Sequence, residues 1–349
     1  MALLTNLTLN QTLLKNGTTF FSDKRTVVND VMTWFTAFSC LATLVLNGIL
    51  VTAIACRAEL HTAFNLYIVN IAVTDICAGL TNMPGTILNG YHNRWPYNPL
   101  SCTILLAYGG TVFGAVNRYA HVLVTVNRFW AVTLPISYRQ RHTKGVALAL
   151  IAVTWIVVHV LCLPVIIRGR INVSPLDPNC WIDRSQQRFY SFVEELLCFT
   201  VPEVVIILMY AVILVKLFQR EKQKHVKVTS HGMHVMVMQV PALAPESDTV
   251  KDHGSAAVAA GRSGGDRTPS SRRSKERVLA YLVIELLLCW TPNNVFYLLV
   301  ASWAPFYWNT TFFAVQYFGQ FLHSWVSPIL CYLAMDGLRN GINRMFQRS

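Results

Sequence analysis

Four charged side chains of this 349-residue protein lie inside long apolar stretches of its sequence. They are Asp75, Arg118, Glu203 and Glu285. A charge in an apolar environment is costly unless other charged or polar groups compensate it, so these residues are candidates for ion binding, ligand binding or a conformational switch. Which of these they do depends on the elements that carry them and on how those elements pack.

The stretches that carry these charges have the length and composition of membrane-spanning helices. Apolar residues make up 53% of the chain and charged residues 13%, whereas a soluble domain has about 25% charged residues. A spanning helix needs about 20 mostly apolar residues. Seven such runs are present, at residues 31–56, 64–89, 102–133, 144–167, 189–218, 277–303 and 309–335. We therefore expect an all-α membrane protein, a bundle of seven transmembrane helices, and not a β-barrel, which would show shorter alternating segments.

Two signals predict an extracellular N-terminus. In that orientation 18 of the 26 Lys and Arg residues outside the spans fall on the cytoplasmic side, as they do in other membrane proteins. They do not form one basic patch, so the net charge of +12 does not point to a nucleic-acid partner. The sequons for N-glycosylation all fall outside in the same orientation, at Asn6, Asn10, Asn16, Asn172 and Asn309. We expect a multi-pass glycoprotein of the plasma membrane.

Composition divides the chain into five segments. In order they are a glycosylated extracellular N-terminus (1–30), transmembrane helices one to five (31–218), a cytoplasmic loop (219–276), transmembrane helices six and seven (277–335), and a short amphipathic helix with the cytoplasmic tail (336–349). The middle of the loop is rich in Ser, Gly, Ala, Pro and charged residues. Such a segment buries little apolar surface, so we predict that the loop is disordered.

Two of the nine cysteines are expected to form a disulfide. Seven cysteines lie inside spans or at their cytoplasmic ends. Cys102 precedes the third span and Cys180 lies between the fourth and fifth, so both face the oxidising side of the membrane. Their bond would hold the fourth-to-fifth loop across the outer end of the bundle.

An ordered set of motifs inside the spans resembles that of a known family. The motifs are Asn47, Asn70 to Asp75, Asn127-Arg128-Phe129 with Pro135, Trp155, Pro202 with Tyr210, Cys289-Trp290-Thr291-Pro292, and Ser327-Pro328. Together with the two outer cysteines they resemble the rhodopsin-like (class A) G-protein-coupled receptors, over residues 31–347 except the long loop. The resemblance implies an extracellular ligand, a heterotrimeric G protein as partner, and a short eighth helix after the seventh span.

The resemblance also assigns residues to G-protein coupling and activation. These are Asn127, Arg128, Pro135, Tyr210, Pro292 and Pro328. In the family an acid precedes the arginine and a second acid lies at the base of helix six. Here these positions hold Asn127 and Arg272, with Glu276 one turn higher as a possible substitute. We therefore predict a weakened inactive-state lock and raised basal signalling.

The seventh span departs from the family at its tyrosine. Cys331 occupies the position of that tyrosine, and Tyr332 follows one residue later. One residue corresponds to about 100° around a helix, so Tyr332 should face a different direction. The family's active-state contact to Tyr210 is thereby in doubt.

Two polar sites are expected in the middle of the bundle. By family position, Asp75 has Asn117, Ser324 and Ser327 as neighbours, with His323 as a further possibility, and this group either binds Na⁺ or forms a hydrated polar core. Arg118 stands where the family usually has an apolar residue, and by family position Glu203 and Glu285 lie close to it. We predict a buried ion pair or triad between Arg118 and one or both of these glutamates.

The ligand site is expected at the outer half of the bundle, without a cofactor. Retinal is excluded because its attachment position in helix seven holds Phe321 and the only lysine in a span is Lys216, at a cytoplasmic end. Local similarity to amine receptors lacks their helix-three Asp, since the matching stretch reads Gly109-Gly110-Thr111. The residues expected to contact a cationic small molecule or peptide are Glu194, Glu195, Trp290, Asn293, Asn294, Tyr297, Tyr317 and Phe321. Pairing of one glutamate with a loop arginine, such as Arg184, is the alternative.

Two other classes of protein compete with a receptor. A transporter or channel would use the buried charges as a polar path, but the sequence has no internal repeat of the kind that builds many transporters. An enzyme is not expected, because neither a metalloprotease motif nor another nucleophile set occurs in the chain.

Overall fold

The computed structural model describes residues 27–92, 94–168, 180, 188–237, 269–302 and 310–347, and the side chains of these residues apart from 168, 221–237, 269–276 and 310. All five expected glycosylation sites lie outside the described residues, as does the middle of the expected cytoplasmic loop. Those predictions therefore stay predictions.

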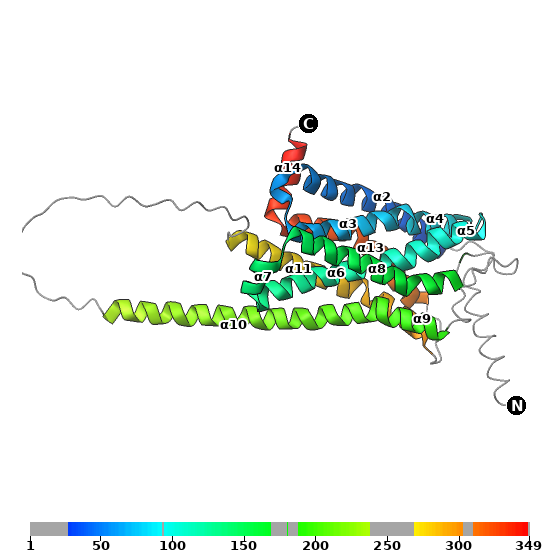
Figure 1. Ribbon diagram of the computed structural model, residues 1–349. Coiled ribbons are helices and arrows are strands. Elements are labelled where there is room, and N and C mark those ends of the chain that lie inside the picture. The colour runs from blue at the N-terminus through cyan, green and yellow to red at the C-terminus, as the bar shows by residue number, and fades with distance from the viewer. Residues whose placement is uncertain are drawn as a thin grey trace, which may run out of the picture.

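The described residues form helices that lie side by side in one bundle (Figure 1). The first four spans and the segments that connect them contain α2 (Val27–Cys56), η2 (Ala58–Leu60), α3 (Ala63–Leu80), α4 (Asn82–His92), α5 (Pro99–Cys102), η3 (Thr103–Tyr108), α6 (Gly109–Thr133), α7 (Pro135–Arg141) and α8 (Lys144–Arg168). The last three spans and the C-terminal helix contain α9 (Arg188–Glu195), η5 (Leu196–Thr200), α10 (Val201–Val237), α11 (Pro269–Cys289), α12 (Thr291–Ala301), α13 (Thr310–Ala334) and α14 (Asp336–Phe346). A helix or a set of joined helices thus corresponds to each of the seven expected spans.

Length and composition support membrane crossing. Within the described part of the chain, five helices are long and apolar enough to span a membrane, and α11 with α12 makes a sixth if the bent pair is one span. Helix α13 has 25 residues but carries polar side chains, and these face the bundle: Gln316, His323, Ser324 and Ser327 are all buried. The expected seven-helix bundle is confirmed.

The distribution of apolar and polar side chains on helix α2 indicates a lipid environment around the bundle. Its exposed side chains are large and apolar, namely Trp34, Phe38, Leu41 and Val45. The middle of its buried face is polar and contains Thr36, Ser39, Thr43 and Asn47. The Asn47 amide donates to the backbone oxygens of Thr43 (2.9 Å) and Ser324 (2.8 Å), which joins α2 to α13. Apolar groups outside and hydrogen-bonded polar groups inside are the arrangement that a lipid environment favours.

The cytoplasmic loop is shorter than the sequence predicts. Helix α10 continues to Val237 and α11 begins at Pro269, so both ends of the expected 219–276 loop are helical. Figure 1 shows α10 extending well beyond the bundle. The residues after 218 are rich in Gln, Lys, Arg and Glu and contain no proline before Pro241, and such residues propagate a helix that is already formed.

The expected eighth helix is present as α14, which lies across the end of the bundle next to α2 (Figure 1). Its buried side is apolar, with Leu338 and Ile342 against the core. Arg277 in the first half of α11 forms an ion pair with Asp336 at the start of α14, with an N–O distance of 3.1 Å. The amphipathic character predicted from the sequence is confirmed.

The sixth span bends by 42° between α11 and α12. Trp290 lies at the break and Pro292 follows it near the start of α12, where proline needs no hydrogen-bond partner for its nitrogen. Helix α13 approaches the break closely at Gly319. A Cβ atom added at Gly319 would lie 2.5 Å from the backbone oxygen of Cys289.

This close approach predicts a specific sensitivity to side-chain size. Gly319→Ala should destabilise the protein by about 1–3 kcal/mol, because backbone atoms have to move to admit the methyl group. Gly48→Ala is the matched control, since a Cβ atom there meets nothing within 4 Å. The measurement is the thermal unfolding midpoint of purified protein. Equal midpoints for the two variants would contradict the packing described at the bend.

Candidate functional site

Arg118 lies on α6 in the middle of the bundle and is 6% exposed. Its Nη2 atom donates to the side-chain oxygens of Asn293 (3.0 Å) and Asn294 (3.1 Å) on α12. The guanidinium carbon lies 4.1 Å from the ring centre of Trp290 and 4.6 Å from that of Phe199. Amide oxygens and aromatic faces thus compensate this charge.

The expected ion pair or triad of Arg118 with Glu203 and Glu285 is wrong in its direct form. Among the described side chains, no ion pair joins Arg118 to either glutamate. The amide of Asn294 accepts from Arg118 with its oxygen and donates to Glu203 with its nitrogen, so it bridges the two charges. Glu203 also accepts from the hydroxyl of Thr291. Glu285 instead contacts His323, at 3.0 Å.

A polar chain continues from this bridge to α13. The amide nitrogen of Asn293 donates to the side-chain oxygens of Gln316 (2.8 Å) and Gln320 (3.1 Å). Sequence reasoning missed both glutamines. The available signal was their four-residue spacing, which places them on one face of the helix.

The structure brings together only part of the expected ligand set. Trp290, Asn293 and Asn294 surround Arg118, as described above. Tyr317 faces α2 instead, where its hydroxyl lies 2.7 Å from that of Thr36, and its ring centre lies 5.0 Å from that of Phe321. Tyr297 is half-buried beside Phe296, with ring centres 5.3 Å apart. The carboxylates of Glu194 and Glu195 are both buried on α9, which packs against α12.

Close helix packing explains why α6 carries glycines where amine receptors carry an acid. A Cβ atom at Gly110 would lie 2.5 Å from the Asn82 amide nitrogen, and one at Gly109 would lie 2.6 Å from the Thr81 hydroxyl. Thr81 and Asn82 form the break between α3 and α4. An aspartate at Gly110 would therefore displace the Asn82 side chain.

A second polar cluster lies below Trp290 around Asp75. The Asn117 amide donates to the Asp75 carboxylate (3.0 Å) and to the Thr74 hydroxyl (2.8 Å). His323 lies between two acids, with Nε2 3.4 Å from Asp75 and Nδ1 3.0 Å from Glu285. The sequence offered His323 only as a further possibility beside Asp75.

The geometry around Asp75 suits the expected Na⁺ ion in part. Asp75 Oδ2 and Asn117 Oδ1 are buried oxygens without a hydrogen-bond partner. Ser324 and Ser327 are buried on α13 as expected. These oxygen-bearing residues would hold Na⁺ and neutralise the carboxylate. Sodium binding stays a prediction.

At the cytoplasmic end of α6, neutral groups contact Arg128. Its Nη2 atom donates to the Asn127 side-chain oxygen (2.8 Å), and its guanidinium carbon lies 3.9 Å from the ring centre of Phe64. The Asn127 amide nitrogen lies 2.7 Å from Nε2 of His142, and the Tyr138 hydroxyl donates to the Asn127 oxygen (3.3 Å). The asparagine that replaces the usual acid is thus built into a network with the loop after α6.

The remaining expected coupling residues are placed as follows. Pro135 opens α7, and Pro328 lies inside α13. Tyr210 is half-buried on α10. Cys331 is buried while the Tyr332 hydroxyl donates to Asn343 on α14, at 3.0 Å. The expectation that Tyr332 faces a different direction is confirmed. The side chains of Arg272 and Glu276 lie outside the described ones.

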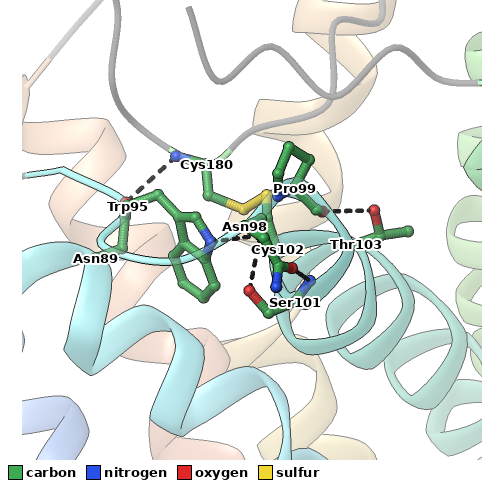
Figure 2. The surroundings of a disulfide bond; sticks show 8 residues. All are labelled: Asn89, Trp95, Asn98, Pro99, Ser101, Cys102, Thr103 and Cys180. Carbon is green, nitrogen blue, oxygen red and sulfur yellow. Dashed lines mark hydrogen bonds between the residues drawn. A yellow bond between two sulfur atoms is a disulfide. The ribbon is translucent and has the colours of Figure 1, made fainter.

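The predicted disulfide joins Cys102 and Cys180 at the outer end of the bundle (Figure 2). Cys102 is the last residue of α5. The backbone nitrogen of Cys180 donates to the Asn89 side chain (3.3 Å), and the Trp95 indole donates to the backbone oxygen of Asn98 (3.1 Å). The prediction from topology is confirmed, and residue 180 is fixed next to α4 and α5.

Comparison with known proteins identifies the class to which this fold and site belong. The family described as "7 transmembrane receptor (rhodopsin family)" matches residues 46–332. The chain belongs to this family.

The curated relatives share little more than a quarter of their residues with the matched part of the chain. The chain is 27% identical over 170 residues to the human 5-hydroxytryptamine receptor 1D, which covers 49% of the chain and 45% of that protein. It is 28% identical over 166 residues to the 5-hydroxytryptamine receptor 1A of Xenopus laevis, covering 47% of the chain and 40% of that protein. The chain thus spans less than half the length of the curated relatives it matches.

The environment of Arg118 predicts a large cost for removing its charge. Arg118→Leu leaves the oxygens of Asn293 and Asn294 without their donor and leaves the Glu203 carboxylate without a nearby cation, so it should destabilise the protein by about 3–5 kcal/mol. Arg118→Lys keeps the charge and should cost less. The measurements are surface expression and the thermal unfolding midpoint. A leucine variant as stable as the parent protein would refute the bridged network.

Proposed function

We propose that this protein is a plasma-membrane receptor with an extracellular N-terminus, which binds an extracellular ligand and activates heterotrimeric G proteins. The observation that carries the proposal is Arg128, held at the cytoplasmic end of α6 within a chain that matches the receptor family. Nothing in the comparisons supports the alternative of a transporter or channel.

The bend of the sixth span supports a switching mechanism. Trp290 lies at the break between α11 and α12, and its ring contacts Arg118 above and His323 below, with a ring-centre distance of 4.4 Å to the histidine. A ligand that rearranges Arg118 and α12 would change the packing of this ring. A helix bent at a proline can swing its cytoplasmic half, so ligand binding would shift an existing equilibrium towards a state with an open cytoplasmic cleft.

A cationic group is the ligand chemistry that the outer site favours. Glu194 and Glu195 are buried at the outer end of the fifth span, on α9. The curated relatives are named as receptors for 5-hydroxytryptamine, an amine. Because an acid at Gly110 would have to displace the Asn82 side chain, a carboxylate on α9 takes the place of the helix-three acid of amine receptors in this proposal. Small amines and peptides with a basic residue both satisfy it.

The test of the function is basal G-protein activation in transfected cells, measured for each G-protein subtype. The intact protein should activate at least one subtype above mock-transfected cells, and Arg128→Ala should abolish the signal at matched surface expression. Arg139→Ala is the control, because Arg139 lies near the same end of the bundle on α7. A basal signal that Arg128→Ala leaves unchanged, or no signal for any subtype despite surface expression, would count against the proposed coupling.

Because Asn127 is neutral, an acid at this position should restrain Arg128 more strongly and stabilise the inactive state. Asn127→Asp places a carboxylate at a position 2.8 Å from Arg128 Nη2 and should lower basal signalling, by up to about fivefold if the pair contributes about 1 kcal/mol. Asn127→Ala removes the hydrogen bond and should not lower it. The measurement is the basal signal normalised to surface receptor. A higher signal for the aspartate variant would contradict the idea of a weakened lock.

A further inference from the structure

Three potential metal ligands from three helices converge in the middle of the bundle. His121 lies on α6, Glu285 on α11 and His323 on α13, and all three are buried. One ligand atom from each lies within 4.8 Å of the others. They lie just below Trp290, whose ring centre is 5.5 Å from that of His121 and 4.4 Å from that of His323. Residues from three separate helices therefore form one compact group.

Two atoms of this group are buried without a hydrogen-bond partner. They are Nε2 of His121 and Oε2 of Glu285. A buried polar atom that forms no bond is costly, and the cost is higher in a membrane, where water cannot compensate it. Both atoms are electron-pair donors of the kind that coordinate Zn²⁺. A bound cation would satisfy both at once.

His323 has the arrangement of a metal ligand supported by a carboxylate. Its Nδ1 atom faces Glu285, and its Nε2 atom lies 3.4 Å from the Asp75 carboxylate. Histidines that bind a metal through one ring nitrogen usually donate the other N–H to a carboxylate or carbonyl, which orients the ring and raises its basicity. Asp75 supplies that second partner.

The charge of the cluster favours a divalent ion. Asp75 and Glu285 carry two potential negative charges, and the Arg118 guanidinium donates to Asn293 and Asn294. A proton on His323 balances only one carboxylate, whereas a divalent cation balances both. Imidazole nitrogens select zinc and other transition metals, while Na⁺ prefers oxygen ligands.

We propose that His121, Glu285 and His323 form a binding site for a divalent transition-metal ion of the zinc class, with Asp75 as the supporting carboxylate. Zinc ligand atoms lie about 2.0–2.2 Å from the ion. Atoms that now lie up to 4.8 Å apart would therefore draw closer, and the ion would tie α11 to α6 and α13.

The site also implies a regulatory effect, which rests on the proposed function. Glu285 lies on α11, the half of the sixth span below the bend. An ion that holds Glu285 against His121 and His323 opposes an outward swing of α11. Since it binds one state better than the other, it shifts the equilibrium towards the inactive state.

The binding test uses purified full-length protein with Co²⁺ as a spectroscopic probe and Zn²⁺ as competitor. Histidines between residues 221 and 268 are first replaced by alanine to remove accidental metal binding; they are His225, His231, His234 and His253. This background protein should bind one equivalent of Co²⁺, with the intense visible bands of a four-coordinate ion, and Zn²⁺ should displace it. No saturable spectrum, or stabilisation by Na⁺ alone, overturns the proposal.

Single substitutions then locate the site. His121→Asn, Glu285→Gln and His323→Asn should each weaken Zn²⁺ binding by at least about 100-fold, and Asp75→Asn by about 10–100-fold, as for other supporting residues of metal sites. His159→Ala is the matched control, because this half-buried histidine on α8 bonds to Tyr108 and lies outside the triad. Monodispersity and thermal unfolding without metal show that each variant is folded. Unchanged affinity in the folded triad variants, or an equal loss in His159→Ala, overturns the site.

The regulatory effect has its own readout. Zn²⁺ should lower the basal signal of the background protein and leave that of the folded triad variants unchanged. Stoichiometric binding with no change in a measurable basal signal would overturn the regulation. The Co²⁺ spectrum needs no signalling, so failure of the metal site and failure of the proposed receptor function are separately detectable.

Discussion

The cost of burying charge in a membrane dictates the middle of this bundle. Asp75, Glu285 and Arg118 all lie at less than a tenth of their full exposure, far from water. His323 contacts both acids through one imidazole ring, with Asp75 next to one nitrogen and Glu285 next to the other. These contacts join α3, α11 and α13, whose lipid-facing surfaces have no hydrophobic reason to associate. Polar compensation, supported by packing, is therefore what brings these helices to one place.

Trp290 separates the buried charges into two layers. Above its ring, the side-chain amides of α12 accept hydrogen bonds from Arg118, and one of them, Asn294, also donates to Glu203. Below the ring lie His121 and His323, with their ring centres 6.1 Å apart. The same tryptophan occupies the break at which α11 and α12 diverge. A change in either layer thus acts on the residue around which the sixth span bends, which gives the outer and inner halves of the bundle a shared physical contact.

The sequence predicted the spans because apolar length and composition are local properties. It also predicted the disulfide, since topology places Cys102 and Cys180 on one side. It located Arg118 as a buried charge but assigned the wrong direct partners. A position in the family alignment predicts which backbone segments are neighbours, but it does not predict that a side chain such as Asn294 lies between two charges. The His121–Glu285–His323 group was missed for a related reason: 164 residues separate the first two along the chain, and no spacing motif signals a meeting of three helices. At the ends of the long loop, the basic flanks at 220–227 and 272–277 fitted either helical extensions or a solvated margin, and the structure shows helix at both.

Polar contacts restrain α11 at more than one level of the bundle. At the cytoplasmic end of α6, Arg128 donates to Asn127 of the same helix and packs against Phe64 of α3. An ion pair in the first half of α11 joins Arg277 to Asp336, and both side chains are more than a third exposed, so it contributes about 0–1 kcal/mol. The contact of Glu285 with His323 is fully buried and joins α11 to α13 in the low dielectric of the membrane. A buried acid that loses its hydrogen-bond partner costs about 1–3 kcal/mol, more than an exposed ion pair contributes. A buried polar contact therefore holds α11 at mid-membrane, below the bend.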